Sequence, residues 1–233
     1  MKSLASVSRE EWKNYVLILP VGSIESHGVL PPALDVAIAT CFLEMCEDER
    51  AIYAPPIPVS TSWEHMGLEP TISVGVDTFA KYLKEVVESS SRYFKAVMVL
   101  CSHGGSYQVA YAIARELTAK GVKVGVFSLH RCIERFLKGL GIEPRVIHAD
   151  PIEASLALAC LGSVDGVAEV SKDLAIELAK ELKPLEKPLD PWTWVDIGER
   201  FAQDTLPGSR ELGIELLHRC CEELREGIDW LAR

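Results

Sequence analysis

The chain has very few amide side chains and no hydrophobic run of membrane-spanning length. Asn14 is its only asparagine, and Gln108 and Gln203 are its only glutamines. Because amides are heat-labile, their scarcity, together with abundant glutamate and 13 prolines, is typical of a protein from a thermophile. The longest apolar runs, Val16–Val21 and Ala96–Cys101, fall far short of the roughly 20 residues that a transmembrane helix needs. We therefore expect no membrane partner.

Positive charge is also in the minority. The chain has 24 lysines and arginines against 34 aspartates and glutamates, which gives a formal net charge of -10 at pH 7. A field of this sign repels phosphate backbones, and no stripe of basic residues interleaved with aromatic residues opposes it locally. We therefore expect no nucleic-acid partner.

The seven cysteines lack the spacing of a structural zinc site. Cys41 and Cys46 are too far apart, and Cys220 and Cys221 too close together, for the CxxC pair of a zinc knuckle. The N-terminal residues show no pattern of a signal peptide. We expect a cytoplasmic protein whose cysteines are reduced and buried as small hydrophobic residues rather than paired in disulfides.

The length and composition favour one folded domain over residues 1–233. Hydrophobic residues make up 48% and charged residues 25% of the chain, and no internal repeat or low-complexity stretch divides it. Short apolar runs alternate with amphipathic helical patterns, which is typical of buried parallel strands and the crossover helices that cover them. We expect a three-layer α/β/α sandwich with a mostly parallel central sheet. The expected strands cover 16–19, 52–59, 96–101 and 122–127, and the expected helices cover 35–46, 77–93, 106–120, 130–140, 151–161, 171–182 and 209–231.

Two loops that follow expected strands carry reactive side chains. The loop after the first strand contains Glu25 and His27 and leads to Asp35, and the loop after the third strand contains His103 in the sequence SHGGS. In an open α/β sheet, such loops meet at the carboxyl ends of the strands. Carboxylates and imidazoles are the donors of zinc, manganese and iron sites, so the two loops indicate a divalent metal site.

A third cluster, HADPIEAS, covers residues 148–155. Pro151 suits the first turn of a helix, which would place Glu153 in that turn and His148 in the loop just before it. Both side chains could face one cavity, where they could bind a metal or transfer a proton.

Each candidate also has a purely structural explanation. Asp35 could cap the helix that follows it, the first-loop carboxylate and imidazole could form an ion pair, and the paired glycines could make an ordinary turn. His65 lies in a loop that could line the same cleft, and we keep it as a candidate. His130 and His218 lack a carboxylate-rich or glycine-rich setting and are not expected at the site.

At these clusters the chain resembles the creatininase family of metal-dependent amidohydrolases. The first family motif, PVGSxExHGxxLPxxxD, is matched continuously by residues 20–28, and Asp35 supplies its last position. The second motif, NGHGGN, corresponds to residues 101–106, and the third, HAGxxETS, to residues 148–155. A weaker match to PGTIS lies at residues 70–73.

The chain departs from the family pattern at several positions. The spacing from Glu25 to Asp35 is one residue shorter than in creatininase itself, and both asparagines of the second motif are replaced. Asp150 stands where the family has a glycine. Gly105 stands where creatininase proper has a glutamate, as in the glycine-glycine branch of the family.

The resemblance implies a site for two divalent ions, which would be zinc, iron or manganese. Glu25 and His103 would bind one ion, His27 would bind the other, and Asp35 would bridge them. Glu153 would complete the ligands of the second ion.

The resemblance also implies catalytic and substrate-binding residues. His148 would pass a proton to the departing nitrogen, since imidazole titrates near the working pH, and Glu153 could share that role if it is not a ligand. The positions that would contact substrate are Ser102, Gly104, Gly105, Ser106 and His65.

The implied activity is hydrolysis of a non-peptide carbon–nitrogen bond in a small amide, cyclic amide or formamide, with a water activated by the two ions. The thermophile-like composition favours the archaeal formamidopyrimidine nucleotide deformylase of the glycine-glycine branch. Opening of the creatinine ring, trimming of a peptide-derived cofactor precursor, and a binding or scaffolding role without chemistry are the alternatives.

A nucleotide substrate and an oligomeric assembly would each require further functional residues. A nucleotide phosphate needs cations, and Arg131, Arg145 and Arg210 are the candidates. Family members commonly form symmetric oligomers, so we expect a homo-oligomer, with Trp192 and Trp194 as possible contact residues.

Overall fold

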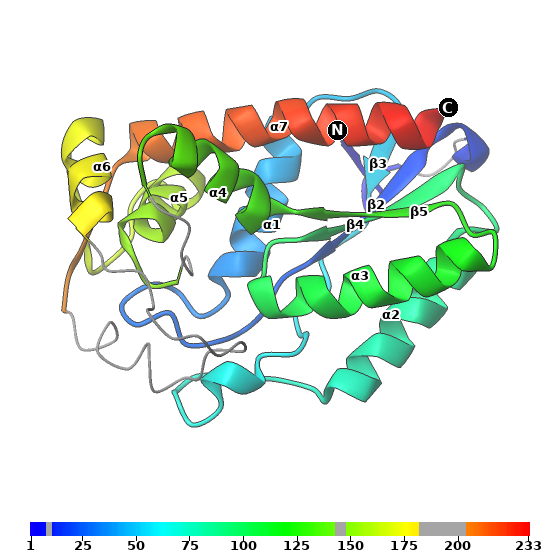
Figure 1. The fold of residues 1–233 in the computed structure, drawn as a ribbon, viewed down its shortest axis with the longest axis horizontal. Helices are drawn as coiled ribbons and strands as arrows, with labels where there is room; N and C mark the ends of the chain where they lie inside the picture. The colour runs from blue at the N-terminus through cyan, green and yellow to red at the C-terminus, as the bar shows by residue number, and fades with distance from the viewer. Residues whose placement is uncertain (8–10, 143–147, 182–203) are drawn as a thin grey trace.

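Five parallel strands form one sheet in residues 1–7, 11–142, 148–181 and 204–233, which the computed structural model describes (Figure 1). In order across the sheet they are β1 (Lys2–Ser3), β3 (Ala51–Tyr53), β2 (Val16–Val21), β4 (Ala96–Cys101) and β5 (Val124–Ser128). Every residue of β2 and β4 is buried, which explains their unbroken apolar sequences. The two strands pair in register from Val16 with Ala96 to Val21 with Cys101, so their carboxyl ends are level.

Helices cover both faces of the sheet (Figure 1). Val16 and Ile18 of β2 pack on one side, while Leu17 and Leu19 pack on the other, because successive side chains of a strand point to opposite faces. The expected three-layer α/β/α architecture is confirmed. The first layer contains α1 (Leu34–Met45) and α7 (Arg210–Ala232), and the second contains α2 (Val76–Ser90) and α3 (Gly104–Ala119).

Helices α4 (Leu129–Gly139), α5 (Pro151–Leu161) and α6 (Lys172–Glu181) extend the first layer beyond the end of the sheet (Figure 1). Helix α5 packs closely on α7 because Gly213 has no side chain, and a Cβ there would overlap the backbone of Ser155. This contact fixes the helix that carries Glu153. The remaining elements are η1 (Trp12–Asn14), η2 (Trp63–His65) and the small parallel pair β6 (Val167–Glu169) and β7 (Leu206–Gly208).

One expected strand is much shorter than predicted. The pattern over 52–59 predicts eight residues, but β3 ends at Tyr53 because Pro55 and Pro56 lack the N–H groups that a ladder requires. The other expected strands and helices begin and end within three residues of the predicted positions in the described parts of the chain.

The expectation of reduced, unpaired cysteines is wrong for four of the seven. Cys41 of α1 is bonded to Cys160 of α5, with Cα atoms 5.5 Å apart, and Cys46 is bonded to Cys221 of α7, with Cα atoms 5.3 Å apart. The partners are 119 and 175 residues apart in the chain, so only the packing of the three helices reveals them. The buried free cysteines are Cys101, Cys132 and Cys220.

Two further expectations concern the surface of the molecule. Among the described residues, no helix combines the length and the hydropathy that crossing a bilayer requires. Trp192 and Trp194, which we expect at a subunit contact, lie outside the described residues.

Candidate metal centre

Five buried ionisable side chains meet at the carboxyl ends of the central strands. Glu25 and His27 come from the loop after β2, and His103 lies directly before α3. Asp35 lies in the first turn of α1, and Glu153 lies in the first turn of α5. Each of the five is at most 4% exposed. Because charged side chains are rarely buried unless they are paired or bind a metal, this concentration marks a candidate functional site.

The imidazole of His103 connects the two loops. Its Nε2 lies 3.0 Å from Oε2 of Glu25, and its Nδ1 lies 3.4 Å from Oγ of Ser60. The Ser60 hydroxyl donates its proton to the carbonyl of Gly22 at 2.8 Å, so it accepts from Nδ1 of His103. Nε2 is therefore the nitrogen that faces the centre.

Asp35 does not cap α1, contrary to the structural explanation of this residue. The N-cap position is Ala33, and Asp35 lies in the first turn. Its Oδ2 accepts a hydrogen bond from Oγ of Ser23 at 2.7 Å, and its Oδ1 lies 3.9 Å from Nε2 of His27. The carboxylate is thus held by one oxygen and directed at the centre by the other.

His27 is oriented in the same way as His103. Its Nδ1 lies 2.9 Å from the backbone carbonyl of Glu25, which can only accept, so Nδ1 carries the proton. Nε2 lies 3.6 Å from Oε1 of Glu153, and no described residue forms a hydrogen bond with it. A buried imidazole that donates through one nitrogen to a backbone carbonyl and presents the other nitrogen is the usual arrangement of a metal ligand.

The start of α5 holds Glu153 rigidly. The side chain of Asp150 caps the helix by accepting from two backbone N–H groups of the first turn, both at 2.9 Å. Oε2 of Glu153 in turn accepts from the backbone N–H of Ala149 at 2.6 Å. Oε1 is left to face His27, and the predicted position of Glu153 in the first turn is confirmed.

Two further imidazoles, His148 and His65, close one side of the centre. Their rings stack with centroids 4.2 Å apart. Nε2 of His148 donates to the carbonyl of Ser26 at 2.9 Å, so its Nδ1, 3.8 Å from Oε1 of Glu25, carries the lone pair. Nε2 of His65 lies 3.4 Å from the same carboxylate oxygen. The structure therefore brings both candidates into the cluster.

The structure also brings two unexpected residues to the centre. His130 was excluded, but it is the second residue of α4, which follows β5 directly, and it offers a nitrogen within 4.8 Å of donor atoms of Asp35 and Glu153. Its place at the carboxyl end of a strand is the signal that the sequence reading overlooked. Glu64 has Oε1 3.5 Å from Nε2 of His103, and no motif in its own segment indicated this contact.

Burial and neighbouring charges shift the ionisation of the acidic residues and of His103. Burial favours the neutral form of Glu25, but the charge and hydrogen bond of His103, together with His27 and His65, outweigh it and hold the pKa of Glu25 well below its usual value. Burial also opposes the charged form of His103, yet Glu25 raises the pKa of His103 well above the usual value. Burial raises the pKa of Asp35 to about 7. Burial and the charge of Asp150 raise the pKa of Glu153 well above its usual range.

Burial favours the neutral form of three further imidazoles, those of His65, His148 and His130. Burial lowers the pKa of His65, lowers that of His148 well below its usual value, and lowers that of His130 to about 4. These shifts describe the side chains on their own. A divalent ion would favour deprotonated carboxylates and neutral imidazoles together, which is a combination that the buried side chains cannot maintain by themselves.

The donor set fits divalent transition metals. In the described residues, four groups of three donors have ligand atoms within 4.8 Å of one another, and several residues belong to more than one group. Mixed imidazole nitrogen and carboxylate oxygen donors suit zinc, manganese and iron. The groups are Glu25, His65 and His148; His27, His148 and Glu153; Glu25, Asp35 and His103; and Asp35, His130 and Glu153.

The residues expected to contact substrate differ in what they do. The single proton of the Ser102 hydroxyl is shared by two backbone carbonyls, 2.9 and 3.1 Å from Oγ, and Oγ of Ser106 donates to the carbonyl of His103 at 2.9 Å. Both hydroxyls thus support the backbone of the loop. Gly104 is exposed and faces open space, whereas a side chain at Gly105 would overlap a neighbouring carboxylate.

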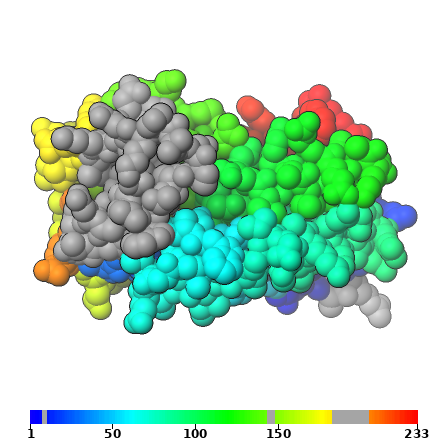
Figure 2. Space-filling model, turned by 60° about the horizontal axis from the view of Figure 1, so that its bottom comes forward, coloured from blue at the N-terminus to red at the C-terminus, as the bar shows by residue number. Residues whose placement is uncertain are grey.

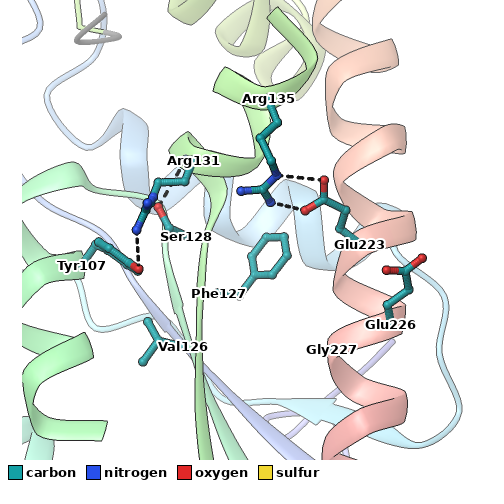
Figure 3. Close-up of a pocket in the computed structure, with 9 residues that line it drawn as sticks. All are labelled: Tyr107, Val126, Phe127, Ser128, Arg131, Arg135, Glu223, Glu226 and Gly227. Carbon is teal, nitrogen blue, oxygen red and sulfur yellow. Dashed lines mark hydrogen bonds and ion pairs between the residues drawn. The ribbon is translucent and has the colours of Figure 1, made fainter. Parts of the chain in front are cut away.

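A cavity of about 280 Å³ lies along β5, between α3, α4 and α7 (Figure 3). Arg131, the residue after His130, lines it and donates from Nη1 to the hydroxyl of Tyr107 at 2.8 Å. Arg135 also lines it and is neutralised by an ion pair with Glu223 (Figure 3). Arg131 is therefore the cation of this cavity that faces a hydroxyl rather than a carboxylate.

Arg210, a second cation candidate, does not line this cavity. Arg210 donates to the carbonyl of Leu158 at 3.1 Å and pairs with Glu169 at 3.2 Å, which ties α7 to α5 and β6. Arg145 lies outside the described residues.

Several known proteins are similar to this chain. The mycofactocin precursor peptide peptidase of Mycolicibacterium smegmatis is 30% identical over 118 residues, which are 47% of this chain and 48% of the relative. The 3-dehydro-scyllo-inosose hydrolase of Thermotoga maritima is 27% identical over 158 residues, which are 62% of this chain and 50% of the relative. The chain thus spans about half the length of the curated relatives it matches.

The fold and the sequence profile point to one family. A solved structure named Creatininase Mn superposes with a TM-score of 0.68 at 19% identity, covering 97% of this chain and 96% of its own, which shows a common fold. The sequence profile of the creatininase family, described as creatinine amidohydrolase, matches residues 3–226. The chain belongs to the creatininase family.

Proposed function

We propose that the chain is a metal-dependent amidohydrolase that cleaves a carbon–nitrogen bond in an amide, cyclic amide or formamide. The observation that carries the proposal is the orientation of three imidazoles. His27, His103 and His148 each use one ring nitrogen to contact a backbone carbonyl or a hydroxyl, and each presents the other nitrogen to buried carboxylates. Such pre-oriented nitrogens bind metal without reorganisation.

The donor positions support two neighbouring ions of zinc, iron or manganese. Glu25 and His103 would hold one ion, His27 and Glu153 would hold the other, and Asp35 would contact both. Bound there, such ions would polarise a carbonyl and lower the pKa of a water molecule. The solved structure with the same fold carries manganese in its name, which supports the choice of metal class.

His148 is the proposed proton-transfer group. Its Nε2–H is held by the carbonyl of Ser26, and its Nδ1 faces the centre with a lone pair because burial keeps the ring neutral. Nδ1 can accept a proton from the attacking water and deliver it to the departing nitrogen. Glu153 would share this role if the second ion does not use it.

The favoured substrate is a formamide on a nucleotide, as in the archaeal formamidopyrimidine nucleotide deformylase. Open space at Gly104, and the guanidinium of Arg131 in a cavity that Arg135, Glu223 and Glu226 also line, support a phosphorylated small molecule. Peptide trimming is the second candidate, because a relative that matches about half of this chain is named a precursor peptide peptidase. Creatinine-type ring opening and a non-catalytic binding role remain the alternatives.

Metal content and product release test the proposal together. The protein should retain two divalent ions per chain after loading with Mn²⁺, Fe²⁺ or Zn²⁺ and dialysis, and it should release formate from a formamidopyrimidine ribonucleotide. Creatinine and a short peptide are tested in parallel. Absence of formate with cleavage of another amide would reject the nucleotide but keep the reaction class. A chain that binds no divalent ion under any of these conditions would reject the hydrolase and favour a binding protein.

We also propose a homo-oligomer in the cytoplasm of a heat-adapted organism. The exposed apolar side chains Trp63, Ile72 and Val76 support a subunit contact. The two disulfides are compatible with the cytoplasm, since intracellular proteins of hyperthermophiles also carry them. Light scattering coupled to gel filtration is expected to give a mass above 25.7 kDa, the mass of one chain.

A further inference from the structure

Glu64 brings a second carboxylate to the imidazole of His103. Its Oε1 lies 3.5 Å from Nε2 of His103, the same nitrogen that Oε2 of Glu25 approaches at 3.0 Å. The segment that carries Glu64 lies below the N-terminal end of α3 in Figure 1. Figure 2 shows that segment, in cyan, on the surface beside the green of α3. The side chain of Glu64 is 24% exposed, so it reaches the centre from the solvent side.

The main chain around Glu64 is held in place by a neighbouring segment. Nε1 of Trp63 donates to the carbonyl of Val74 at 3.1 Å, and the backbone N–H of Ser62 donates to Oγ of Ser73 at 2.8 Å. These bonds hold the start of η2 against residues 73 and 74. The main chain of Glu64 is therefore held beside the centre.

Gly105 leaves the room that the Glu64 carboxylate occupies. Gly105 lies two residues after His103, in the first turn of α3. A Cβ at this position would overlap Oε1 of Glu64, and it would lie 2.9 Å from Cε1 of His103 and 3.1 Å from the carbonyl oxygen of Thr61. A side chain at residue 105 and the carboxylate of Glu64 thus exclude each other.

We propose that Glu64 is an additional ligand of the ion held by Glu25 and His103, and that Gly105 is required to admit it. This inference rests on the proposed metal site. Both carboxylates approach the same imidazole nitrogen, so Glu64 brings a further oxygen donor to the pair Glu25 and His103 from outside the four compact groups of donors. Glu64 would add negative charge to this ion and, because it is partly exposed, would be the ligand most easily exchanged for water or substrate.

The first test is the metal affinity of the Glu64→Gln variant. The dissociation constant for Mn²⁺, measured by chelator competition, is expected to rise about 10- to 100-fold for one ion and to stay unchanged for the other. The absorption spectrum of the Co²⁺-loaded protein should change, whereas the melting temperature of the metal-free protein should not. Glu69→Gln, at an exposed glutamate of the same loop, is the matched control and should bind like the wild type.

A double-mutant cycle tests the role of Gly105. Gly105→Ala should weaken the same ion in the wild-type background and have a smaller effect in Glu64→Ala, where the contact of the new Cβ with Cε1 of His103 remains but the displaced carboxylate is already absent. Additive losses, or wild-type affinity and Co²⁺ spectrum in Glu64→Gln, would overturn the inference and leave the proposed hydrolase standing. Failure of the wild type to bind Mn²⁺ would instead overturn the proposed function itself.

Discussion

Nε2 of His103 lies 3.0 Å from Oε2 of Glu25, and this buried pair joins the loop after β4 to the loop after β2. The two strands are neighbours whose carboxyl ends are level, so both loops leave the sheet at the same edge. Further carboxylates and imidazoles gather around the pair. Buried carboxylates repel one another, so they stay together only when protons or a cation compensate their charge.

Asp35→Asn is expected to release both ions. Asp35 lies between the two sets of donors, and an amide oxygen cannot supply the negative charge that both ions would share. Metal content after dialysis, measured by elemental analysis, should fall towards zero, and metal affinity should drop at least about 100-fold. Asp77→Asn is the matched control, because Asp77 also lies in the first turn of a helix but is exposed. Retention of both ions in Asp35→Asn would contradict the assignment.

His148→Gln separates a proton-transfer role from a ligand role. If Nδ1 of His148 moves protons, kcat should fall about 10²- to 10⁴-fold while two ions remain bound. Both kcat and metal content must be measured, because His148 also belongs to two of the groups of possible ligands. Loss of an ion together with activity would show that His148 is a ligand instead.

Much of the fold and centre follows from local patterns in the sequence. Apolar runs flanked by helical periodicity predicted the strands, and residues placed after those runs identified Glu25, His27 and His103. Pro151 correctly predicted the helix that presents Glu153. These features are encoded within a few residues of each other, which is why they can be read without a structure.

The features that were missed depend on packing between distant segments. Glu64 reaches His103 only because Gly105 leaves space for it, and no spacing rule connects the two segments. The bond between Cys46 and Cys221 likewise needs α1 to pack on α7. His130 is different, since its position after β5 was visible and only the lack of a surrounding motif excluded it.

Metal binding should strengthen as the pH rises through neutrality. The pKa of Asp35 is raised to about 7, and the pKa values of His103 and Glu153 are raised well above their usual values, so these groups keep their protons to higher pH in the metal-free chain than such side chains usually do. An ion binds their deprotonated forms, so binding must release protons, and affinity rises as these protons are lost. Titration calorimetry in buffers of different ionisation enthalpy measures the release. Binding without proton release would contradict the pKa shifts.

Removal of the bond between Cys46 and Cys221 should destabilise the fold. The bond closes a loop of 175 residues, so Cys46→Ala/Cys221→Ala should lose about 2 to 4 kcal/mol of unfolding free energy. Cys132→Ala, at a buried free cysteine, controls for the loss of packing alone. Denaturant unfolding, carried out on oxidised and on reduced protein, measures the unfolding free energies of the double variant and of the control. Equal stability of the double variant and the control would show that the bond does not form.

Arg131→Ala distinguishes a phosphorylated substrate from a neutral one. Arg131 stands over the ring of Tyr107 with its guanidinium 5.2 Å from the centroid, and both residues line the cavity along β5 (Figure 3). A charge-assisted hydrogen bond contributes about 1.5 to 3 kcal/mol, so the variant should raise KM for a formamidopyrimidine nucleotide about tenfold or more. KM for the matching nucleoside, which lacks the phosphate, should not change. Arg115→Ala is the control, since Arg115 stands over Tyr111 in a similar pair but does not line the cavity. Equal effects on nucleotide and nucleoside would move the phosphate site away from Arg131 and weaken the case for a nucleotide substrate.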